Sequence, residues 1–293
     1  MTPIVAIVAV AIGVLAWLIA APAWRARRRA AAMAEPLPAA AVSAIDRNVP
    51  AVRSLPPESR ARLESLMAAF LAEKEFIGCN GLVVTDEMRS TIAALACLLV
   101  LGRRGHYDAL HSVLVYPMAF WVEDEVEDEA GVVSKRRRVL SGEAWESSRI
   151  ILSWDDVLEA ARHPGEGYNV ALHEFAHYLD AEGLGLATPP PSPLPPSRAR
   201  SAERGVRATS EWAADLADEF DALLDAVDRG RYTFLDPYAA EDQAEFFAVA
   251  TEDFFERPVE LRTAHPRLYA LLQEFYALHP ASWTARDAAT TRS

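Results

Sequence analysis

The chain has 293 residues, and its 42 acidic side chains against 29 basic ones give a formal net charge of −13. A charge of this sign argues against nucleic acid as the main partner. Cysteine is rare, and Cys79 and Cys97 both lie in apolar contexts, which argues against a disulfide framework and against a cysteine-ligated zinc site.

An uncharged apolar segment, residues 4–21, lies at the start of the chain and is long enough to cross a bilayer as a helix. Arginines follow it at Arg25 and at 27–29, and positive charge in such a flank stays on the cytoplasmic side. We therefore predict a single-pass transmembrane anchor with a basic flank over residues 1–30, in the inner (cytoplasmic) membrane, with the rest of the chain in the cytoplasm. The alternative is a cleaved signal peptide. Ala21-Pro22-Ala23 loosely resembles a cleavage site, but no charged segment precedes the apolar run.

The remainder of the chain divides into three parts by composition. Residues 31–54 are rich in alanine, proline and valine without a clear period, and are predicted to be a flexible tether. A soluble domain is predicted over 55–280, long enough for one sizeable core with a single cleft. Residues 281–293 are predicted to be a C-terminal tail.

Apolar residues recur at helical spacing through most of this domain, and two short runs rich in β-branched residues are typical of strands. Helices are predicted to begin near Pro56 and Thr85 and to span about 169–183, 210–228, 242–256 and 266–278, with strands over 111–116 and 149–153. The predicted fold class is therefore α+β and mostly helical, with one small sheet on the amino-terminal side of the helix at 169–183.

Two segments between these elements have biased compositions. Residues 123–129 are acidic and 135–138 are basic, with an Ala130-Gly131 turn signal between them. Opposite charges on two arms favour a hairpin or irregular loop over a basic patch for nucleic acid. Residues 188–197 are rich in proline and are predicted to be a loop.

The helix predicted to begin at Asn169 contains an HExxH motif, formed by His173, Glu174 and His177. Histidines four residues apart project from one face of a helix, so both imidazoles can reach one ion. The glutamate beside the first histidine can take a proton from the attacking water. The alternative is a surface helix with solvated side chains, but its apolar neighbours indicate burial, and buried His and Glu need partners. The motif indicates a zinc hydrolase.

A catalytic zinc takes three protein ligands, so a third is expected after His177. Asp180 follows on the same helix, and Glu211 and Asp215 lie on the next one. Glu245 lies among residues that should face the core, where a carboxylate without a partner is costly. Glu245 is the best candidate on these grounds, with an ordinary structural role as its alternative.

Residues on both sides of the motif form further groups. Tyr168 to Val170 and Leu179-Asp180 flank it, Ser141 to Trp145 and Ile151 to Trp154 precede it, and Asp236 to Ala240 and Ala244 to Val249 follow it. With these groups the chain resembles the Mlc titration factor A family of zinc peptidases, from about Leu55 to Pro280. That family shares its catalytic architecture with the carboxy-terminal protease domain of anthrax lethal factor.

The resemblance implies a zincin-like metallopeptidase domain with one catalytic Zn²⁺. It implies that His173, His177 and Glu245 are the zinc ligands and that Glu174 is the general base. It also implies that Tyr238 donates its phenol to the oxyanion of the tetrahedral intermediate. A turn tyrosine packed next to Pro237 is the alternative reading of Tyr238.

The resemblance implies a gluzincin-like enzyme that uses zinc to hydrolyse peptide bonds in a peptide or protein substrate. It leaves open whether the enzyme prefers aminopeptidase or endopeptidase cleavage. The family's namesake role is to bind and inactivate Mlc, a glucose-responsive transcriptional repressor, so a repressor of this kind is a second expected partner. The rival reading is a membrane-tethered regulatory protein that sequesters a repressor, with incidental peptidase activity.

Overall fold

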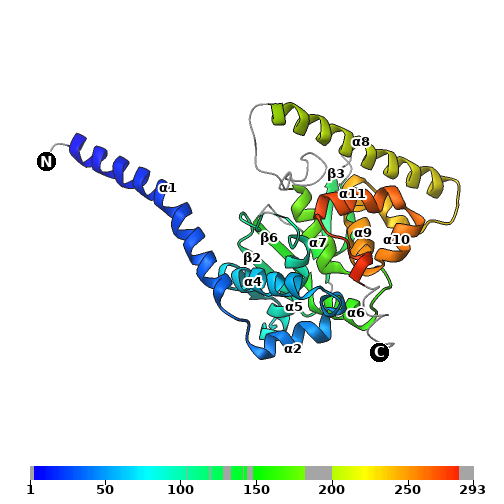
Figure 1. The fold of residues 1–293 in the computed structure, drawn as a ribbon, viewed down its shortest axis with the longest axis horizontal. Coiled ribbons are helices and arrows are strands. Elements are labelled where there is room, and N and C mark those ends of the chain that lie inside the picture. Colours follow the sequence, from blue (N-terminus) through cyan, green and yellow to red (C-terminus); the bar gives the residue numbers. More distant parts are fainter. Residues whose placement is uncertain are drawn as a thin grey trace.

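The computed structural model describes residues 3–103, 105–118, 120–127, 133–140, 142–143, 148–181 and 200–283, and these are mostly helical (Figure 1). Their main sheet has the strand order β1-β2-β6-β5. Strands β1 (Glu75–Gly78), β2 (Ser112–Tyr116) and β6 (Arg149–Ser153) are parallel, and β5 (Gly142–Glu143) pairs antiparallel with β6. The predicted class, mostly helical with a small sheet, is confirmed. The proline-rich segment 188–197 lies outside the described residues.

The two inner strands are apolar because both are buried. Val113 and Val115 of β2 and Ile150 and Leu152 of β6 are fully buried. Parallel strands covered on both faces are near-continuous apolar runs, which is why these two segments were recognisable as strands. The strands predicted over 111–116 and 149–153 are thus confirmed.

A separate two-stranded hairpin is formed by β3 (Phe120–Glu127) and β4 (Val133–Leu140). Its antiparallel register places Glu123 opposite Arg137 and Glu125 opposite Lys135. The acidic and basic segments predicted from composition are therefore the two paired strands of a hairpin. The turn between them lies outside the described residues.

Helices α4 (Pro57–Glu73), α5 (Asp86–Leu99) and α7 (Val170–Leu179) form the core beside the sheet. Helix α5 begins where it was predicted, and Thr85 caps it, because the Thr85 hydroxyl accepts a hydrogen bond from Met88 N at 3.2 Å. Tyr107 joins the three helices: its hydroxyl donates a hydrogen bond to Ala96 O of α5 at 2.6 Å, and its ring contacts the other two. The Tyr107 ring lies 5.7 Å from that of Phe70 on α4 and 5.2 Å from that of Phe175 on α7, so α7 is anchored through the motif's own apolar face.

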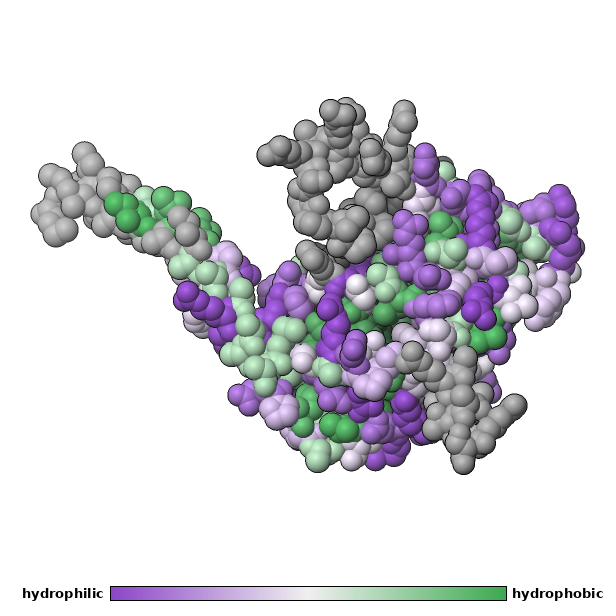
Figure 2. All heavy atoms as spheres, viewed as in Figure 1, coloured by the Kyte–Doolittle hydropathy of each residue, from purple (hydrophilic) through white to green (hydrophobic). Residues whose placement is uncertain are grey.

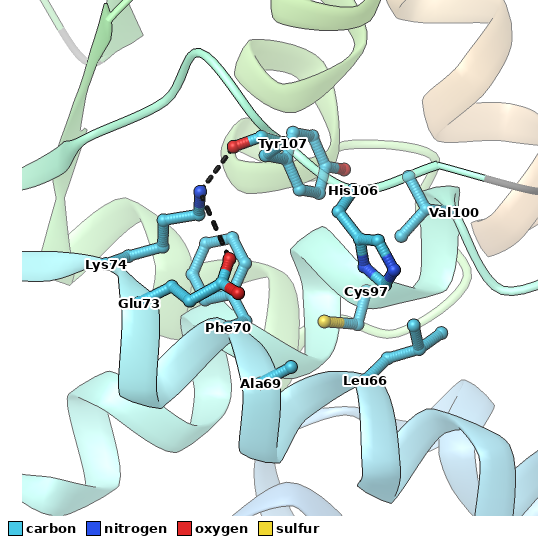
Figure 3. A pocket seen from close by; sticks show the side chains of 9 residues that line it. All are labelled: Leu66, Ala69, Phe70, Glu73, Lys74, Cys97, Val100, His106 and Tyr107. Atoms are coloured by element: carbon cyan, nitrogen blue, oxygen red, sulfur yellow. Dashed lines mark hydrogen bonds and ion pairs between the residues drawn. The ribbon is translucent and has the colours of Figure 1, made fainter. Parts of the chain in front are cut away.

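A cavity of about 10 Å³ lies against α4 (Figure 3). The Lys74 ammonium donates hydrogen bonds to the carbonyls of Tyr107 and Leu110, the latter at 2.9 Å, and lies 3.9 Å from the Glu73 carboxylate. These bonds hold the end of α4 against the segment that precedes β2. The cavity has room for about one water molecule and none of its lining residues belongs to the HExxH motif.

The amino-terminal helix α1 (Pro3–Ala34) extends away from the body of the protein (Figure 1). Several of its large apolar side chains are exposed, namely Ile12, Val14, Leu15, Trp17 and Leu18, and Figure 2 shows apolar surface on this protruding helix. The helix continues through Pro22 and the arginine cluster to Ala34. Among the described residues, no helix is long and apolar enough to cross a membrane. The transmembrane anchor predicted over residues 1–30 therefore has no support in the structure.

Residues 31–54 differ from the predicted flexible tether, because most of them are helical and packed on the domain. Beyond the end of α1, they form α2 (Ala39–Asn48) and α3 (Pro50–Arg53). The buried residues recur three and four positions apart, which is the spacing of one helix face. They are Ala41, Ala44, Ile45 and Asn48 on α2, followed by Val49 and Val52.

The remaining helices surround α7 in two steps. They are α6 (Trp154–Arg162), α8 (Arg200–Asp228), the 3₁₀ helix η3 (Pro237–Ala240), α9 (Gln243–Glu256), α10 (Pro258–Ala264) and α11 (Pro266–Tyr276). Helices α6 and α9 pack against α7, and the other four pack against α9. Helix α8 begins ten residues before its predicted start. Ala281 and Trp283 are buried in the core, so the chain does not leave the domain at residue 281, where the tail was predicted to begin.

Candidate metal centre

Helix α7 carries the HExxH motif and is held firmly at its start. The helix begins where it was predicted, and the Asn169 side chain caps it by accepting a hydrogen bond from Leu172 N at 3.2 Å. The apolar residues of the helix, including Leu172 and Phe175, are buried. The helix is therefore a rigid part of the core, and only the face with the two histidines lines a cleft.

Three donor atoms converge at this face. The Nε2 atoms of His173 and His177 lie 3.0 Å apart. Oε2 of Glu245, from α9, lies 3.1 Å from Nε2 of His173 and 3.4 Å from that of His177. Tetrahedral zinc with bonds of about 2.0 to 2.1 Å separates neighbouring ligand atoms by roughly 3.3 Å. Among the described residues, this is the one group of three or more His, Cys, Asp and Glu side chains that could share an ion.

The charges in the cluster also fit a cation. Burial opposes ionisation of Glu245, but hydrogen bonds with His173 and His177 hold its pKa far below the usual range. Burial lowers the pKa of His173, and hydrogen bonds to Glu245 and Glu252 outweigh this and raise the pKa to about 10. The cluster therefore combines an ionised carboxylate with an imidazole that binds a proton tightly. Protons and metal ions compete for such atoms, so the same set fits a metal.

Glu174 lies beside the cluster in a dry environment. Its side chain is buried, and among the described residues its Oε2 has no hydrogen-bond partner. Burial raises the pKa of Glu174 to about 7, while the neighbouring histidines act to lower it. A carboxyl group with a pKa near neutrality can both accept and release a proton during a reaction.

Tyr238 approaches the cluster from η3. Asp236 caps this short helix by accepting a hydrogen bond from Tyr238 N at 2.8 Å. The Tyr238 ring centroid lies 6.3 Å from that of His173. Burial, together with the charge of Glu245 and a hydrogen bond to it, raises the pKa of Tyr238 well above its usual range. The phenol therefore stays protonated and can donate a hydrogen bond at neutral pH.

The other carboxylates considered as a third ligand do not join the cluster. Asp180 lines the same cleft, but its carboxylate is not among the converging atoms. Glu211 is exposed on α8, and Asp215 forms an ion pair with Arg267. Of the candidates from sequence, the structure thus brings only Glu245 to the two histidines.

Glu252 is a site residue that the sequence analysis missed. It is nearly fully buried, and its Oε1 lies 2.8 Å from Nδ1 of His173. Glu252 follows Glu245 by seven residues, which is about two turns of α9, so both face α7. This spacing was visible in the sequence.

These residues lie in a cleft of about 930 Å³. Its walls are α7, α9, the segment before α7 and the segment that leads into η3. Tyr168 and Tyr238 are about half exposed at its surface. At its inner side, Arg257 Nε donates to Asp253 Oδ1 at 2.6 Å, and its guanidinium lies 4.4 Å from the Phe234 ring centre. The volume is in the range of ligand-binding clefts.

A family model and individual relatives of this chain point to the same family. Residues 23–277 match the model of the family described as glucose-regulated metallo-peptidase M90. The uncharacterized protein slr2042 of Synechocystis sp. is 35% identical over 96% of this chain and 98% of its own length. Mlc titration factor A of Pectobacterium atrosepticum is 36% identical over 80% of this chain and 84% of its own. The same factor of Klebsiella pneumoniae is 34% identical over 79% of this chain and 84% of its own.

The family model covers most of the chain, including α7, η3 and α9, and the three relatives each match more than two thirds of it. The resemblance noted from the sequence groups around the HExxH motif is confirmed. The chain belongs to the glucose-regulated metallo-peptidase M90 family.

Proposed function

We propose that the chain is a zinc-dependent, gluzincin-like metallopeptidase that hydrolyses peptide bonds, with His173, His177 and Glu245 as the ligands of one Zn²⁺. One observation carries this proposal. Two imidazole Nε2 atoms and one carboxylate oxygen converge within 4.8 Å at the wall of a cleft, in a chain of a metallopeptidase family. Nitrogen donors together with a single carboxylate favour zinc over magnesium or calcium, which prefer oxygen donors.

The surrounding side chains can supply the proton transfers of hydrolysis. Bound zinc supplies a Lewis acid that activates water and polarises the peptide carbonyl. Glu174 takes the proton of the attacking water and passes it to the leaving amine, for which its buried, unpaired Oε2 and a pKa near 7 suit it. Tyr238, protonated and close to Glu245, donates its phenol to the oxyanion.

A Glu174→Gln variant tests this assignment against a matched control in the same cleft. Glu166 also lines the cleft but is exposed and lies outside the metal cluster, so Glu166→Gln makes the same change of charge there. We expect chelator-sensitive hydrolysis by the parent and a loss of roughly 100-fold or more in Glu174→Gln. Glu166→Gln should hydrolyse the substrate at close to the parental rate. A folded, zinc-loaded Glu174→Gln protein that is as fast as the parent contradicts the proposal.

The substrates in this test separate two peptidase types. Aminoacyl-chromogenic substrates report aminopeptidase activity, and longer peptides blocked at the amino terminus report endopeptidase activity. The cleft is open to both, because its volume exceeds that of a single amino-acid residue. Aminopeptidase activity is supported if only substrates with a free amino terminus are cleaved.

A regulatory role is a second candidate function, and one observation favours it. Two of the relatives are named Mlc titration factor A, so we propose that this chain also binds an Mlc-like transcriptional repressor. The Glu174→Gln protein separates this role from catalysis. Retained binding of such a repressor together with lost hydrolysis supports a binding function, and no binding by either parent or variant contradicts it.

We further propose that the chain is attached to the inner membrane through its amino-terminal segment, with the peptidase domain in the cytoplasm. Support comes from the uncharged run 4–21 and from the arginines that follow it. Membrane fractions of cells that express the full chain, washed with alkaline carbonate, provide the test. We expect the chain to stay in the pellet, and its release into the supernatant contradicts the proposal.

A further inference from the structure

Helix α9 places a second carboxylate behind the metal cluster. Oε1 of Glu252 lies 2.8 Å from Nδ1 of His173, on the side of the ring opposite to the converging donor atoms. The other oxygen of Glu252, Oε2, accepts a hydrogen bond from the backbone N–H of Asn169, the cap of α7. Only 3% of Glu252 is exposed, so water does not substitute for either contact.

This contact determines how the imidazole is presented. A neutral histidine has one N–H and one lone pair, and the hydrogen bond made by one nitrogen fixes the role of the other. An ionised carboxylate only accepts hydrogen bonds, so Nδ1 of His173 must carry the hydrogen when it faces Glu252. Nε2 then keeps its lone pair toward His177 and Glu245.

A neighbouring carboxylate provides an internal comparison. Glu256 lies four residues after Glu252 and binds the same segment, through Asn169 Nδ2 at 2.8 Å and Gly165 N at 3.4 Å. Within the described part of the chain, Glu256 contacts neither His173 nor the other two members of the cluster. Both glutamates thus form hydrogen bonds with the segment at the start of α7, and only Glu252 contacts a candidate metal ligand.

We propose that Glu252 is a positioning residue that fixes the tautomer and the ring orientation of His173 for metal binding. The inference rests on the proposed function, because it requires His173 to be a zinc ligand. Partners of this kind typically contribute a factor of about 10 to 100 to metal affinity.

Zinc affinity, measured by competition with a chromogenic chelator, tests the proposal on the parent, Glu252→Gln and Glu256→Gln. Glutamine has one acceptor oxygen where glutamate has two, so Glu252→Gln cannot serve both Nδ1 of His173 and Asn169 N. We expect zinc affinity to fall by about 10-fold or more in Glu252→Gln and to change less than about 2-fold in Glu256→Gln. The absorption spectrum of the cobalt-substituted protein should change only in the first.

Urea unfolding of the metal-free proteins separates a structural role from a positioning role. Equal zinc affinity in the two variants, whatever their stability, overturns the role of Glu252. If Glu252→Gln does not fold, Glu252→Asp and Glu256→Asp are compared instead. We then expect the larger fall in zinc affinity in Glu252→Asp. A parent protein that binds no zinc overturns the proposed function as well, whereas zinc binding that is insensitive to Glu252 overturns only this inference.

Discussion

Arg29 binds both carboxylate oxygens of Glu73, with Nε 2.7 Å from Oε1 and Nη2 2.9 Å from Oε2. Nη2 also lies 2.5 Å from Asp108 Oδ1. Paired, planar contacts of this type are stronger than single exposed ion pairs. An arginine of the basic flank thus joins α1 to the folded domain, and the helix ends on the domain surface.

Arg29→Ala should therefore loosen α1. We expect a loss of about 1 kcal/mol in the free energy of unfolding and faster proteolysis between α1 and α2, where residues 35–38 are not helical. Arg27 is exposed on the same helix and serves as the control. Limited proteolysis at equal rates in Arg29→Ala and Arg27→Ala would show that the contact does not hold the helix.

Two glycines before α7 permit a matched test of packing at the cleft. Gly165 and Gly167 have φ angles of +83° and +85°, so alanine is strained at both. A Cβ at Gly167 would also overlap the Arg257 and Asp253 side chains, whereas at Gly165 the nearest atom is 4.0 Å away. Gly165→Ala should cost about 1 kcal/mol and Gly167→Ala more, by urea unfolding. Equal losses would mean that the ion pair moves aside freely.

The stability of the protein should depend on pH through Asp253. Burial raises the pKa of this carboxyl to about 6, although Arg257 acts to lower it. The folded state keeps the proton between about pH 4 and pH 6, where the unfolded chain loses it. The contribution of the protonated Asp253 carboxyl to the free energy of unfolding is fully present below about pH 4 and is lost as the pH rises through 6.

Asp253→Asn removes this titration and keeps an acceptor for Arg257. The difference in free energy of unfolding between parent and variant should shift by about 2 to 3 kcal/mol from pH 4 to pH 7, with the parent losing stability at the higher pH. Urea unfolding at both pH values measures it. Parallel pH curves for the two proteins would exclude Asp253 as the source.

Tyr238→Phe should separate catalysis from metal binding. The phenol lies beside Glu245 but is not one of the three converging donors. Loss of one oxyanion donor costs about 100- to 1000-fold in kcat in other hydrolases, so we expect a loss of this order with zinc stoichiometry unchanged. Steady-state kinetics on zinc-loaded protein provides the measurement. An unchanged kcat would favour the alternative of a packed turn tyrosine.

Much of the fold was predictable because it depends on local patterns. The central strands are apolar runs, Asn169 is a favourable cap, and the HExxH spacing places two imidazoles on one face. Glu245 could be singled out because a carboxylate among core residues needs a partner. Each of these inferences uses residues that are near one another in sequence.

The remaining features depend on contacts between distant segments. Strand β1 is short and mostly exposed, so Glu75–Gly78 shows no alternation. Helix α2 buries two alanines, an asparagine and only one large apolar side chain, Ile45, so its sequence shows little contrast between its faces. Several acidic residues lie on and around α9, and only the contact with His173 distinguishes Glu252 from Glu256.

We have proposed that His173, His177 and Glu245 hold one zinc ion. Metal analysis of the folded protein after dialysis against zinc tests it directly, with His177→Ala as the comparison and circular dichroism as the check of folding. We expect one zinc per chain in the parent and a small fraction of that in His177→Ala. Equal zinc content in the two proteins, or none in the parent, would contradict it.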